Sequence, residues 1–415
     1  MSKKLICHAA ELVTCAGSAP KQGAAMSDIG LIPDGAVLIN GDKIEAVGTT
    51  EALMQQYGDS GCEIIDATGK AVLPGFVDSH THFVFGGYRA DEFSWRLRGD
   101  SYMSIMERGG GINASVSKTR AATLEELIEV GRDRLARMLE FGVTTVEGKS
   151  GYGLDKETEL KQLRAMKALS GTQPVDIVPT FMGAHSVLPE YKGRERDFLD
   201  MLLRDIAPVV KAENLAEFAD IFTEKNVFSI DDSRYYLNAL KEMGFKLKIH
   251  ADEMVQLGGA ELAAEVGTVS ADHLLQASDQ GIADMAKAGV IGTMLPATAF
   301  SLKEEFARAR KMIDDGMAVA VASDLNPGSC FTNSIPLLIA LACIYMCMSI
   351  EEVVTALTIN GAAAVGRADR VGSIEPGKQA DIIFLRYPSI HFLPYHTAIN
   401  LVETVMKNGE IVLTR

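Results

Sequence analysis

The chain has 415 residues, of which 47% are apolar and 23% are charged, a composition typical of a globular protein with a sizeable core. The formal net charge of −15 argues against nucleic acid as a partner, because phosphate binding requires a basic surface. The same charge disfavours docking on anionic membranes. An anionic small substrate would need a local positive patch, so single arginines near a site become informative.

The N-terminal segment begins with two lysines, but His8 and Glu11 interrupt the apolar core that a signal peptide needs. The longest apolar run, residues 335–348, contains a proline and is shorter than the roughly 20 residues that span a bilayer, so we expect a buried helix there. The six cysteines are scattered and form no Cys-x-x-Cys pair. These features predict a reduced, cytoplasmic protein without a membrane segment.

The two ends of the chain both have the character of short strands and turns. The stretch GAVLINGDKIEAVG (35–48) predicts a hairpin around an Asn-Gly-Asp turn, and a second Asn-Gly turn lies at 408–409. Two β-rich ends around a different middle suggest that the termini come together. We therefore expect residues 1–73 and 366–415 to form one discontinuous small β-sandwich domain beside a domain of residues 74–365.

The middle of the chain alternates between apolar strands that end in polar residues and helical stretches. Eight such strand–helix units occupy roughly 285 residues, close to the usual size of a (β/α)8 barrel of the TIM type. The strands are mostly apolar throughout, as expected where both faces are buried. The predicted helices cover residues 123–141, 155–170, 192–205, 229–244, 256–266, 277–288, 303–315 and 334–347.

Histidines gather at the ends of the predicted barrel strands, the rim where barrel enzymes build their active sites. His80 and His82 are two residues apart on a strand, so their side chains share a face and can bind one ion. A single His-x-His pair fits two packed histidines equally well. Five histidines at one rim, together with Asp324 at the end of MAVAVASD, are difficult to explain by packing. These histidines are His80, His82, His185, His250 and His273.

This order of His-x-His, His, His and Asp along a (β/α)8 barrel resembles the amidohydrolase superfamily, and the resemblance spans nearly the whole chain. It implies one divalent or trivalent metal ion, zinc or iron. The implied ligands are His80 and His82 on the first strand, His250 on the fifth and Asp324 on the eighth. A metal in such a site activates water. Imidazole and carboxylate ligands also accept manganese, so the sequence does not choose the metal.

The segment KIHADE places Glu253 three residues after His250, which looks like the His-x-x-Glu pattern of mononuclear cyclic deaminases and related hydrolases. The resemblance implies that Glu253 takes a proton from water and passes it to the leaving nitrogen, with assistance from Asp324. His273 on the sixth strand would hydrogen-bond the attacking water or the developing oxyanion. Alternatively, Glu253 only begins the following helix.

Binuclear members of the superfamily carry a carboxylated lysine on the fourth barrel strand. We assign the segment FMGAH, which ends in His185 and has no lysine, to the fourth strand. Lys149 in VEGKSGYG is assigned to the third strand and is interpreted as a structural residue or one that lies behind the metal ligands. This favours one metal ion, although a different strand count would reopen the binuclear alternative.

Several segments resemble the imidazolonepropionase family more closely than other members of the superfamily. That family opens 4-imidazolone-5-propanoate with water to give N-formimidoyl-L-glutamate in histidine degradation. The resemblance implies a hydrolase of a small cyclic amide that bears a carboxylate, and a homodimer, which no feature of the sequence demonstrates. The segments are DSHTHFVFGGYRADEF, LRGDSYMSIMERGGGI, EGKSGYGLD, FMGAHSVLPEY, KIHADE and SDLNPGS.

The propionate of such a substrate needs a positive partner, and the planar guanidinium of Arg89, in the first strand-to-helix loop, is the expected one. Tyr102 and Tyr152, in the first and third such loops, could donate hydroxyl groups to the same carboxylate. His185 is expected to contact the ring or its carbonyl. Arg89 could instead form an ion pair with an acidic neighbour, Asp91 or Glu92.

Two loops complete the candidate site. In SDLNPGS, the residues Asn326, Gly328 and Ser329 follow Asp324 on a Pro-Gly turn whose backbone and amide groups could grip the ring or the propionate. The GGG at 109–111 lacks the pattern of a phosphate loop. The three glycines favour a 101–113 loop that forms a flap over the site. Ordinary loop flexibility is the alternative.

Two other functions remain open. The first is a deaminase of a small heterocycle on the same scaffold, which would need no carboxylate clamp of the kind that Arg89 offers. The second is a non-catalytic scaffold or binding protein, which would usually have lost metal ligands. This sequence retains every ligand that the mononuclear pattern requires.

Overall fold

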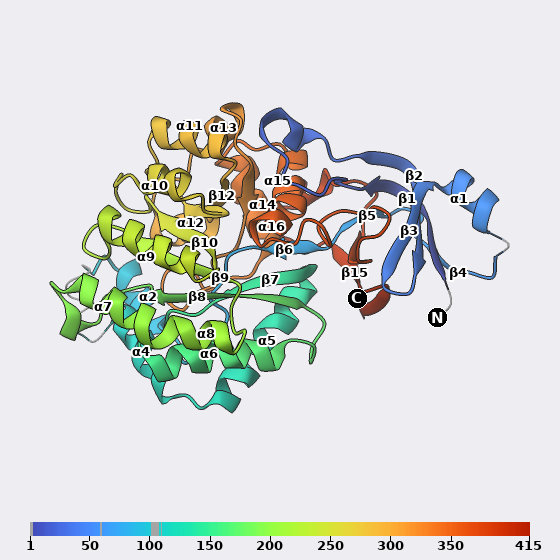
Figure 1. The fold of residues 1–415 in the computed structure, drawn as a ribbon. Coiled ribbons are helices and arrows are strands. Elements are labelled where there is room, and N and C mark those ends of the chain that lie inside the picture. The colour runs from blue at the N-terminus through green and yellow to red at the C-terminus, as the bar shows by residue number, and fades with distance from the viewer. Residues whose placement is uncertain (1–2, 59, 101–107, 109) are drawn as a thin grey trace.

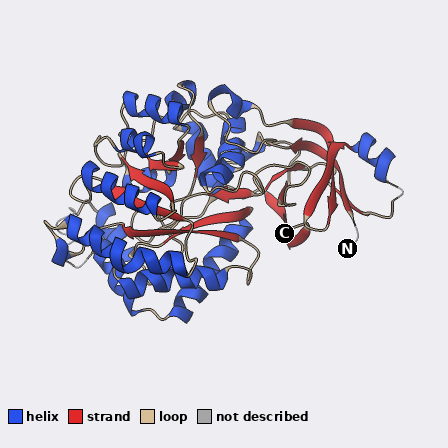
Figure 2. Cartoon of the chain, in the orientation of Figure 1, coloured by secondary structure: helices blue, strands red, loops and turns tan. Residues whose placement is uncertain are grey.

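The computed structural model describes residues 3–58, 60–100, 108 and 110–415. A barrel surrounded by helices makes up the larger part, and a sheet that contains both ends of the chain lies beside it (Figure 1). Figure 2 shows that helices gather around the barrel, whereas the smaller part is mostly strand. None of the helices in the described part of the chain is long and apolar enough to cross a membrane.

Eight parallel strands form the barrel, and their order in space is their order along the chain. Most of their residues are buried, because helices cover the outside and side chains fill the inside. The strands are β6 (Phe76–Asp78), β7 (Val143–Lys149), β8 (Asp176–Ala184), β9 (Phe218–Thr223), β10 (Lys246–Ala251), β11 (Ser270–His273), β12 (Ile291–Met294) and β13 (Val319–Val321).

The first and last barrel strands are joined at and just beyond their C-terminal ends. The backbone amide of Asp324 donates to the carbonyl of His80 at 3.0 Å. The buried carboxylate of Asp78 accepts from the amide of Ser323 at 2.9 Å and from its hydroxyl at 2.6 Å. These contacts close the barrel and bring together segments that are 245 residues apart in the chain.

The smaller part is a mixed eight-stranded sheet in the order β16-β15-β14-β5-β1-β2-β3, with β4 also paired to β1. Strand β14 pairs with β5, so the C-terminal strands complete the sheet begun by the N-terminal ones, as predicted. One face of the sheet encloses a separate apolar core. The strands are β1 (Lys4–Val13), β2 (Leu31–Asn40), β3 (Lys43–Thr49), β4 (Glu63–Asp66), β5 (Ala71–Pro74), β14 (Ile382–Leu385), β15 (Val402–Lys407) and β16 (Glu410–Thr414).

Both predicted Asn-Gly turns are present as two-residue hairpin connections. Asn40 pairs with Lys43 across the first turn, between β2 and β3. The second turn joins β15 to β16 through Asn408 and Gly409, whose φ angles are 52° and 76°. Positive φ at both central residues matches the twist of the flanking strands, which explains why asparagine and glycine occupy this turn.

Helices cover the barrel and its ends; six of the predicted ranges agree with them to within three residues at each end, and two do not. The structure contains α1 (Thr50–Tyr57), α2 (Ala90–Leu97), α4 (Ile112–Ala121), α5 (Leu124–Glu140), α6 (Lys156–Leu169), α7 (Glu195–Met201), α8 (Ala207–Ala212), α9 (Ile230–Glu242), α10 (Gly259–Val266), α11 (Asp279–Ala288), α12 (Pro296–Leu302), α13 (Ala309–Asp314), α14 (Ile335–Ile344), α15 (Ile350–Leu357), α16 (Ile359–Ala364) and α17 (Phe392–Tyr395). Short turns of helix are η1 (Gly23–Ser27), η2 (Pro189–Tyr191) and η3 (Leu202–Ile206).

Only the second half of the range 303–315, predicted as one helix, is helical. Lys303 adopts a left-handed φ of 61° that ends α12, and α13 begins only at Ala309. The helix predicted over 192–205 continues instead to Ala212. It contains a π-helical turn, η3, just before Pro208, where proline has no N–H for the regular bond pattern.

The structure corrects our numbering of the early barrel strands. The strand that leads to His185 is the third, β8, and Lys149 ends the second, β7, whereas we expected the fourth and the third. Residues 83–142 are long enough for another strand–helix unit, but their described part forms only α2, α4 and α5. Tyr152 therefore lies in the second strand-to-helix loop. The fourth strand, β9, contains no lysine within Phe218–Thr223.

The contact between Asp78 and Ser323 predicts a large effect on stability. Asp78→Ala should lower the free energy of unfolding by about 3 kcal/mol, because it leaves a buried amide and a buried hydroxyl of Ser323 without an acceptor. Denaturant unfolding followed by circular dichroism measures this change. Asp369→Ala, at an exposed aspartate, is the control and should change stability by less than about 0.5 kcal/mol. Equal effects of the two substitutions would contradict this account of barrel closure.

Candidate active site

The four predicted metal ligands come from the ends of three barrel strands and gather at the rim, where His82, His250 and Asp324 line one cavity. His80 and His82 follow β6, His250 lies in β10 and Asp324 follows β13, and none of the four is more than 3% exposed. The ring centroids of His80 and His250 are 4.6 Å apart, and His80 Nε2 lies 3.5 Å from Asp324 Oδ1. Donor atoms of His80, His82 and Asp324 lie within 4.8 Å of one another, so one ion could contact all three.

The three histidines among these four residues are uncharged, so each can offer a nitrogen lone pair to a metal ion. His80 Nδ1 lies 2.7 Å from Asp272 Oδ2, and His82 Nδ1 lies 3.2 Å from the carbonyl oxygen of Ser150. A proton on each Nδ1 leaves the Nε2 lone pair free. Burial lowers the pKa of His80, His82 and His250 well below the usual histidine value, which favours the neutral form.

A divalent cation fits this set of donors. The Nε2 atoms of His80 and His250 are buried, and neither has a hydrogen-bond partner among the residues that the structure describes. Buried nitrogen atoms without a partner are costly, and neutral imidazole nitrogens with one carboxylate are ligands that zinc and iron accept.

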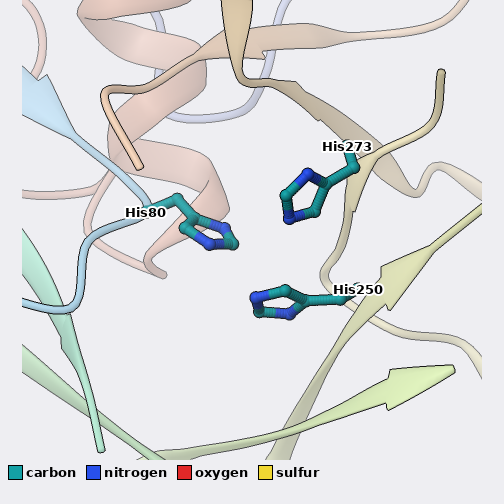
Figure 3. Close-up of side chains that lie close together, drawn as sticks. All are labelled: His80, His250 and His273. Atoms are coloured by element: carbon teal, nitrogen blue, oxygen red, sulfur yellow. The ribbon is translucent and has the colours of Figure 1, made fainter. Parts of the chain in front are cut away.

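Two more histidines complete the rim. Figure 3 shows the rings of His80, His250 and His273 directed toward one another from the loop after β6, from β10 and from β11, and the centroids of His250 and His273 are 5.1 Å apart. His185 stacks on His82 with the ring centroids 4.8 Å apart and the planes 8° from parallel. The structure thus brings together all five histidines that the sequence placed at the rim, which is more donors than one four-coordinate ion needs.

Glu253 faces His273 from the segment after β10, with Oε1 3.5 Å from Nδ1 of the histidine. Glu224 holds this segment, because its Oε2 accepts from the backbone amide of Met254 at 2.9 Å. Only 14% of the Glu253 side chain is exposed. Burial raises the pKa of Glu253 to about 8, and the negative charges of Asp324 and Glu224 act in the same direction. Such a carboxyl group can both hold and release a proton near neutral pH.

The next helix, α10, begins at Gly259 and takes its cap from Asp252, so Glu253 is not the residue that starts it. Asp252 Oδ1 accepts from the amides of Leu257 and Gly258 at 2.8 and 3.0 Å. The φ of Asp252 is 49°, in the left-handed region. This turn of the backbone separates the roles of two adjacent carboxylates, because Asp252 fixes the helix while Glu253 borders the cavity.

Asp324 is held through the carboxylate oxygen that does not face His80: its Oδ2 accepts from the hydroxyl of Thr298 at 2.6 Å. Burial raises the pKa of Asp324 to about 7. In the turn that follows, Asn326 Oδ1 accepts from the amides of Gly328 and Ser329, each at 2.8 Å. Its Nδ2 donates to the carbonyl of Asp324 at 2.8 Å. The amide of Asn326 is therefore engaged in fixing the turn.

Arg89 lies at the start of α2 and is paired with Glu92, the alternative that we noted from the sequence. Its Nε donates to Glu92 Oε2 at 2.8 Å, and its Nη2 donates to Oε1 of the same carboxylate. Its Nη1 lies against Gly328, so a side chain at that position would collide with the guanidinium. Arg96 donates to the carbonyl of Gly328 at 2.9 Å. Glycine at 328 is therefore what allows Arg89 to approach this turn.

Two cavities meet at Ser329. The outer one, of about 520 Å³, is lined by Arg89, Gly328 and exposed aromatic side chains that include Phe331. The inner one, of about 60 Å³, is lined by His82, Tyr152, His185, Phe222, His250, Glu253, His273, Asp324, Asn326 and Ser329. Tyr102 and most of the 101–113 loop lie outside the described residues.

Tyr152 lies beside the histidines in the inner cavity. Its ring centroid is 5.4 Å from that of His82 and 5.1 Å from that of His185. Burial raises the pKa of the Tyr152 hydroxyl far above its usual value, so the group stays protonated and can act as a donor.

A cluster of charged side chains lies behind the histidines, and we refer to it as the lysine–carboxylate cluster. All five side chains are 0% exposed. We expected Lys149 to be structural or to lie behind the ligands, but the sequence analysis did not single out the other members. The only signal in the sequence was a charged residue inside a predicted barrel strand, as in VTTVEGK or KLKIHA. The cluster consists of Glu147, Lys149, Asp220, Lys248 and Asp272.

Comparison with known proteins agrees with this geometry. Residues 71–412 match the model of the amidohydrolase family. A protein of Clostridium tetani named imidazolonepropionase is 58% identical over 98% of this chain and 97% of its own length. A protein of the same name from Parabacteroides distasonis is 58% identical over 99% of both chains.

The chain belongs to the imidazolonepropionase family of amidohydrolases. The match covers nearly the full length of both relatives, so it includes the strands of both chain ends as well as the barrel. The family resemblance read from the sequence is thereby confirmed. Membership in the amidohydrolases supports a divalent metal ion in this member of the imidazolonepropionase family. The set of histidine and aspartate donors described above supports it as well.

Solved structures of other hydrolases share the fold at low sequence identity. An atrazine chlorohydrolase from Arthrobacter aurescens complexed with zinc has a TM-score of 0.74 at 17% identity, covering 99% of this chain and 95% of that one. An adenosine deaminase from Xanthomonas campestris with bound zinc has a TM-score of 0.71 at 18% identity, covering 100% and 93%. These likenesses confirm the predicted fold class, a (β/α)8 barrel with a small β-domain from both ends.

Proposed function

We propose that the protein hydrolyses 4-imidazolone-5-propanoate to N-formimidoyl-L-glutamate, a step of histidine degradation. The observation that carries the proposal is a pair of cavities with Ser329 in both linings: a metal-type donor set and a protonatable glutamate border the inner one, and Arg89 borders the outer one. Relatives that are 58% identical over nearly their whole length carry the name imidazolonepropionase, which gives independent support.

In this proposal His80, His82, His250 and Asp324 hold one metal ion, zinc or iron. The ion, when bound, would polarise the ring carbonyl and lower the pKa of a water molecule. Zinc is supported by its presence in two solved structures of the same fold, an atrazine chlorohydrolase and an adenosine deaminase. A bound cation would also lower the pKa of Asp324 and keep it ionised.

Glu253 is the proposed proton shuttle. Water adds its oxygen to the ring carbonyl carbon, and Glu253 accepts the proton that this water loses. The carbon–nitrogen bond of the ring then breaks, and Glu253 returns the proton to the departing nitrogen, so that atoms and charges balance. His273, 3.5 Å from Glu253, is positioned to hydrogen-bond the water or the oxygen that becomes negative.

Arg89 is the proposed partner of the propionate. Glu92 occupies one edge of its guanidinium, and the remaining N–H groups can form a second charged pair. Tyr152 and Tyr102 are proposed hydroxyl donors to the same carboxylate, and His185 is proposed to contact the ring. The turn that contains Asn326, Gly328 and Ser329 would border both the ring and the carboxylate.

Four further assignments belong to the proposal. We propose that the enzyme acts in the cytoplasm and is a homodimer, as the family resemblance implies, and light scattering with size exclusion would measure its mass. No partner other than a small carboxylate-bearing substrate is proposed. We also propose that residues 1–73 and 366–415 form one domain and residues 74–365 the other. Limited proteolysis, with the cleavage sites identified, would test these boundaries.

Turnover of the substrate tests the proposal directly. Metal-loaded protein should consume imidazolone propionate, seen as loss of its ultraviolet absorbance, and release N-formimidoyl-L-glutamate in equal amount. Release of ammonia from other heterocycles, without turnover of this acid, would favour the deaminase alternative. Metal-loaded but inert protein would favour the non-catalytic scaffold.

Glu253→Gln should keep its metal and lose most of its turnover. The amide cannot shuttle a proton, so kcat should fall by about 10²- to 10⁴-fold. Metal analysis and steady-state kinetics measure the two properties in the same preparation. Glu304→Gln removes an exposed carboxylate whose charge contributes to the raised pKa of Glu253, and it should retain near-normal kcat. A near-normal kcat in Glu253→Gln would remove Glu253 from this role.

Arg89→Ala should raise KM for the acid substrate by on the order of 10- to 100-fold, because it removes a charged hydrogen-bond partner. The KM for an uncharged imidazolone should change far less, since that compound has no carboxylate to pair. Arg98→Ala, at an exposed arginine just after the same helix, is the control and should leave both KM values near wild type. An equal rise for both compounds would show that Arg89 acts on the fold of the loop and not on the carboxylate.

A further inference from the structure

The lysine–carboxylate cluster connects two of the proposed metal ligands through one ammonium group. Lys149 Nζ lies 2.6 Å from Asp220 Oδ2 and 3.4 Å from Asp272 Oδ2. The same two oxygen atoms lie close to the histidines: Asp272 Oδ2 is 2.7 Å from His80 Nδ1, a hydrogen bond, and Asp220 Oδ2 is 3.1 Å from His250 Nδ1, a polar contact without hydrogen-bond geometry. A continuous chain of polar contacts therefore runs from one imidazole to the other with Lys149 at its centre.

We propose that Lys149 is a positioning residue that fixes His80 and His250 together, through Asp272 and Asp220, in the orientation that binds the metal ion. The inference rests on the proposed metal site and adds to it a residue that contacts neither metal nor substrate. Each carboxylate oxygen lies between the ammonium and an imidazole, so its place is determined from both sides. Neither histidine can rotate without breaking a contact that Lys149 also uses.

The strands that carry these residues explain why one lysine can do this. His80 follows β6, Lys149 ends β7, Asp220 lies in β9, His250 in β10 and Asp272 in β11. Their side chains point into the barrel, where parallel strands bring alternate residues of several strands to one level. Partners behind a metal-binding histidine set its tautomer and ring orientation, and their loss typically lowers metal affinity by about 10- to 100-fold.

Lys248 provides a matched comparison within the same cluster. Its side chain is also 0% exposed, and its Nζ lies 2.7 Å from Glu147 Oε2 and 3.1 Å from the carbonyl oxygen of Ser79. These contacts serve the interior of the barrel, and within the described residues no carboxylate that faces a metal-ligand histidine lies in ion-pair contact with Lys248. The two lysines share burial, charge and the carboxylate of Glu147, and the charge of Lys248 also lowers the pKa of Asp272. Among the described residues, however, only Lys149 lies in ion-pair contact with the two aspartates that face the histidines.

The test compares metal affinity in Lys149→Met and Lys248→Met. Each purified variant competes for Co²⁺ or Zn²⁺ against a chromophoric chelator, and the visible spectrum of the Co²⁺ form reports ligand geometry independently of turnover. Lys149→Met should bind metal about 10- to 100-fold more weakly than wild type, with an altered Co²⁺ spectrum. Lys248→Met should lose comparable stability but keep metal affinity within a few-fold of wild type.

A second variant keeps the test decisive if Lys149→Met does not fold. The double substitution Lys149→Met with Asp220→Asn removes one charge of each sign, so the net charge of the cluster is unchanged, and it should fold with weakened metal binding. Wild-type affinity in either folded Lys149 variant would overturn the inference. An equal loss of metal affinity in Lys248→Met would also overturn the inference, because the loss would then follow from removing any buried lysine of the cluster. If the wild-type protein binds no metal, the proposed function itself fails, which is a distinguishable result.

Discussion

Three carboxylates and two lysines are buried together behind the active-site histidines, and one of these lysines, Lys149, connects two of the proposed metal ligands through Asp272 and Asp220. Removing such charges from water costs several kcal/mol per ion unless each one finds partners. Here each lysine contacts at least one carboxylate, and Asp272 also accepts from Ser270 at 2.7 Å. A barrel interior built only of apolar side chains would avoid this cost but could not fix imidazole rings by hydrogen bonds. The charged part of the barrel interior lies directly behind the histidines, whose ring orientation matters for the proposed chemistry.

The rim above this cluster concentrates backbone strain and perturbed acidity in the same few residues. Asp252, His273 and Asp324 have φ angles of 49°, 75° and 50°, a region that side chains other than glycine rarely adopt. Burial raises the pKa of both Glu253 and Asp324 toward neutrality. The closure of the barrel by Asp78 and Ser323 holds the first and last strands close enough for these groups to share one pocket.

The sequence was sufficient to predict the fold class, because alternation of apolar strands with helices and two Asn-Gly hairpins are local patterns. It also predicted the residues that meet at the rim, since strand ends of a parallel barrel face one side. It did not predict the numbering of the early strands, because the long segment 83–142 contains helices where another unit could have stood. Nor did it identify Asp220 and Asp272, which became meaningful only when folding brought them to Lys149 and the histidines. Pairing over such distances along the chain leaves no periodic signal.

The central claim is that one ion is held by His80, His82, His250 and Asp324 while the lysine–carboxylate cluster stays free of metal. Anomalous diffraction at the absorption edge of the bound metal, on crystals of the metal-loaded protein, tests it most directly. The account predicts one peak per chain, about 2.0–2.3 Å from nitrogen and oxygen atoms of those four residues. A second peak in the pocket, or a peak bound by Asp220 and Asp272, would contradict it.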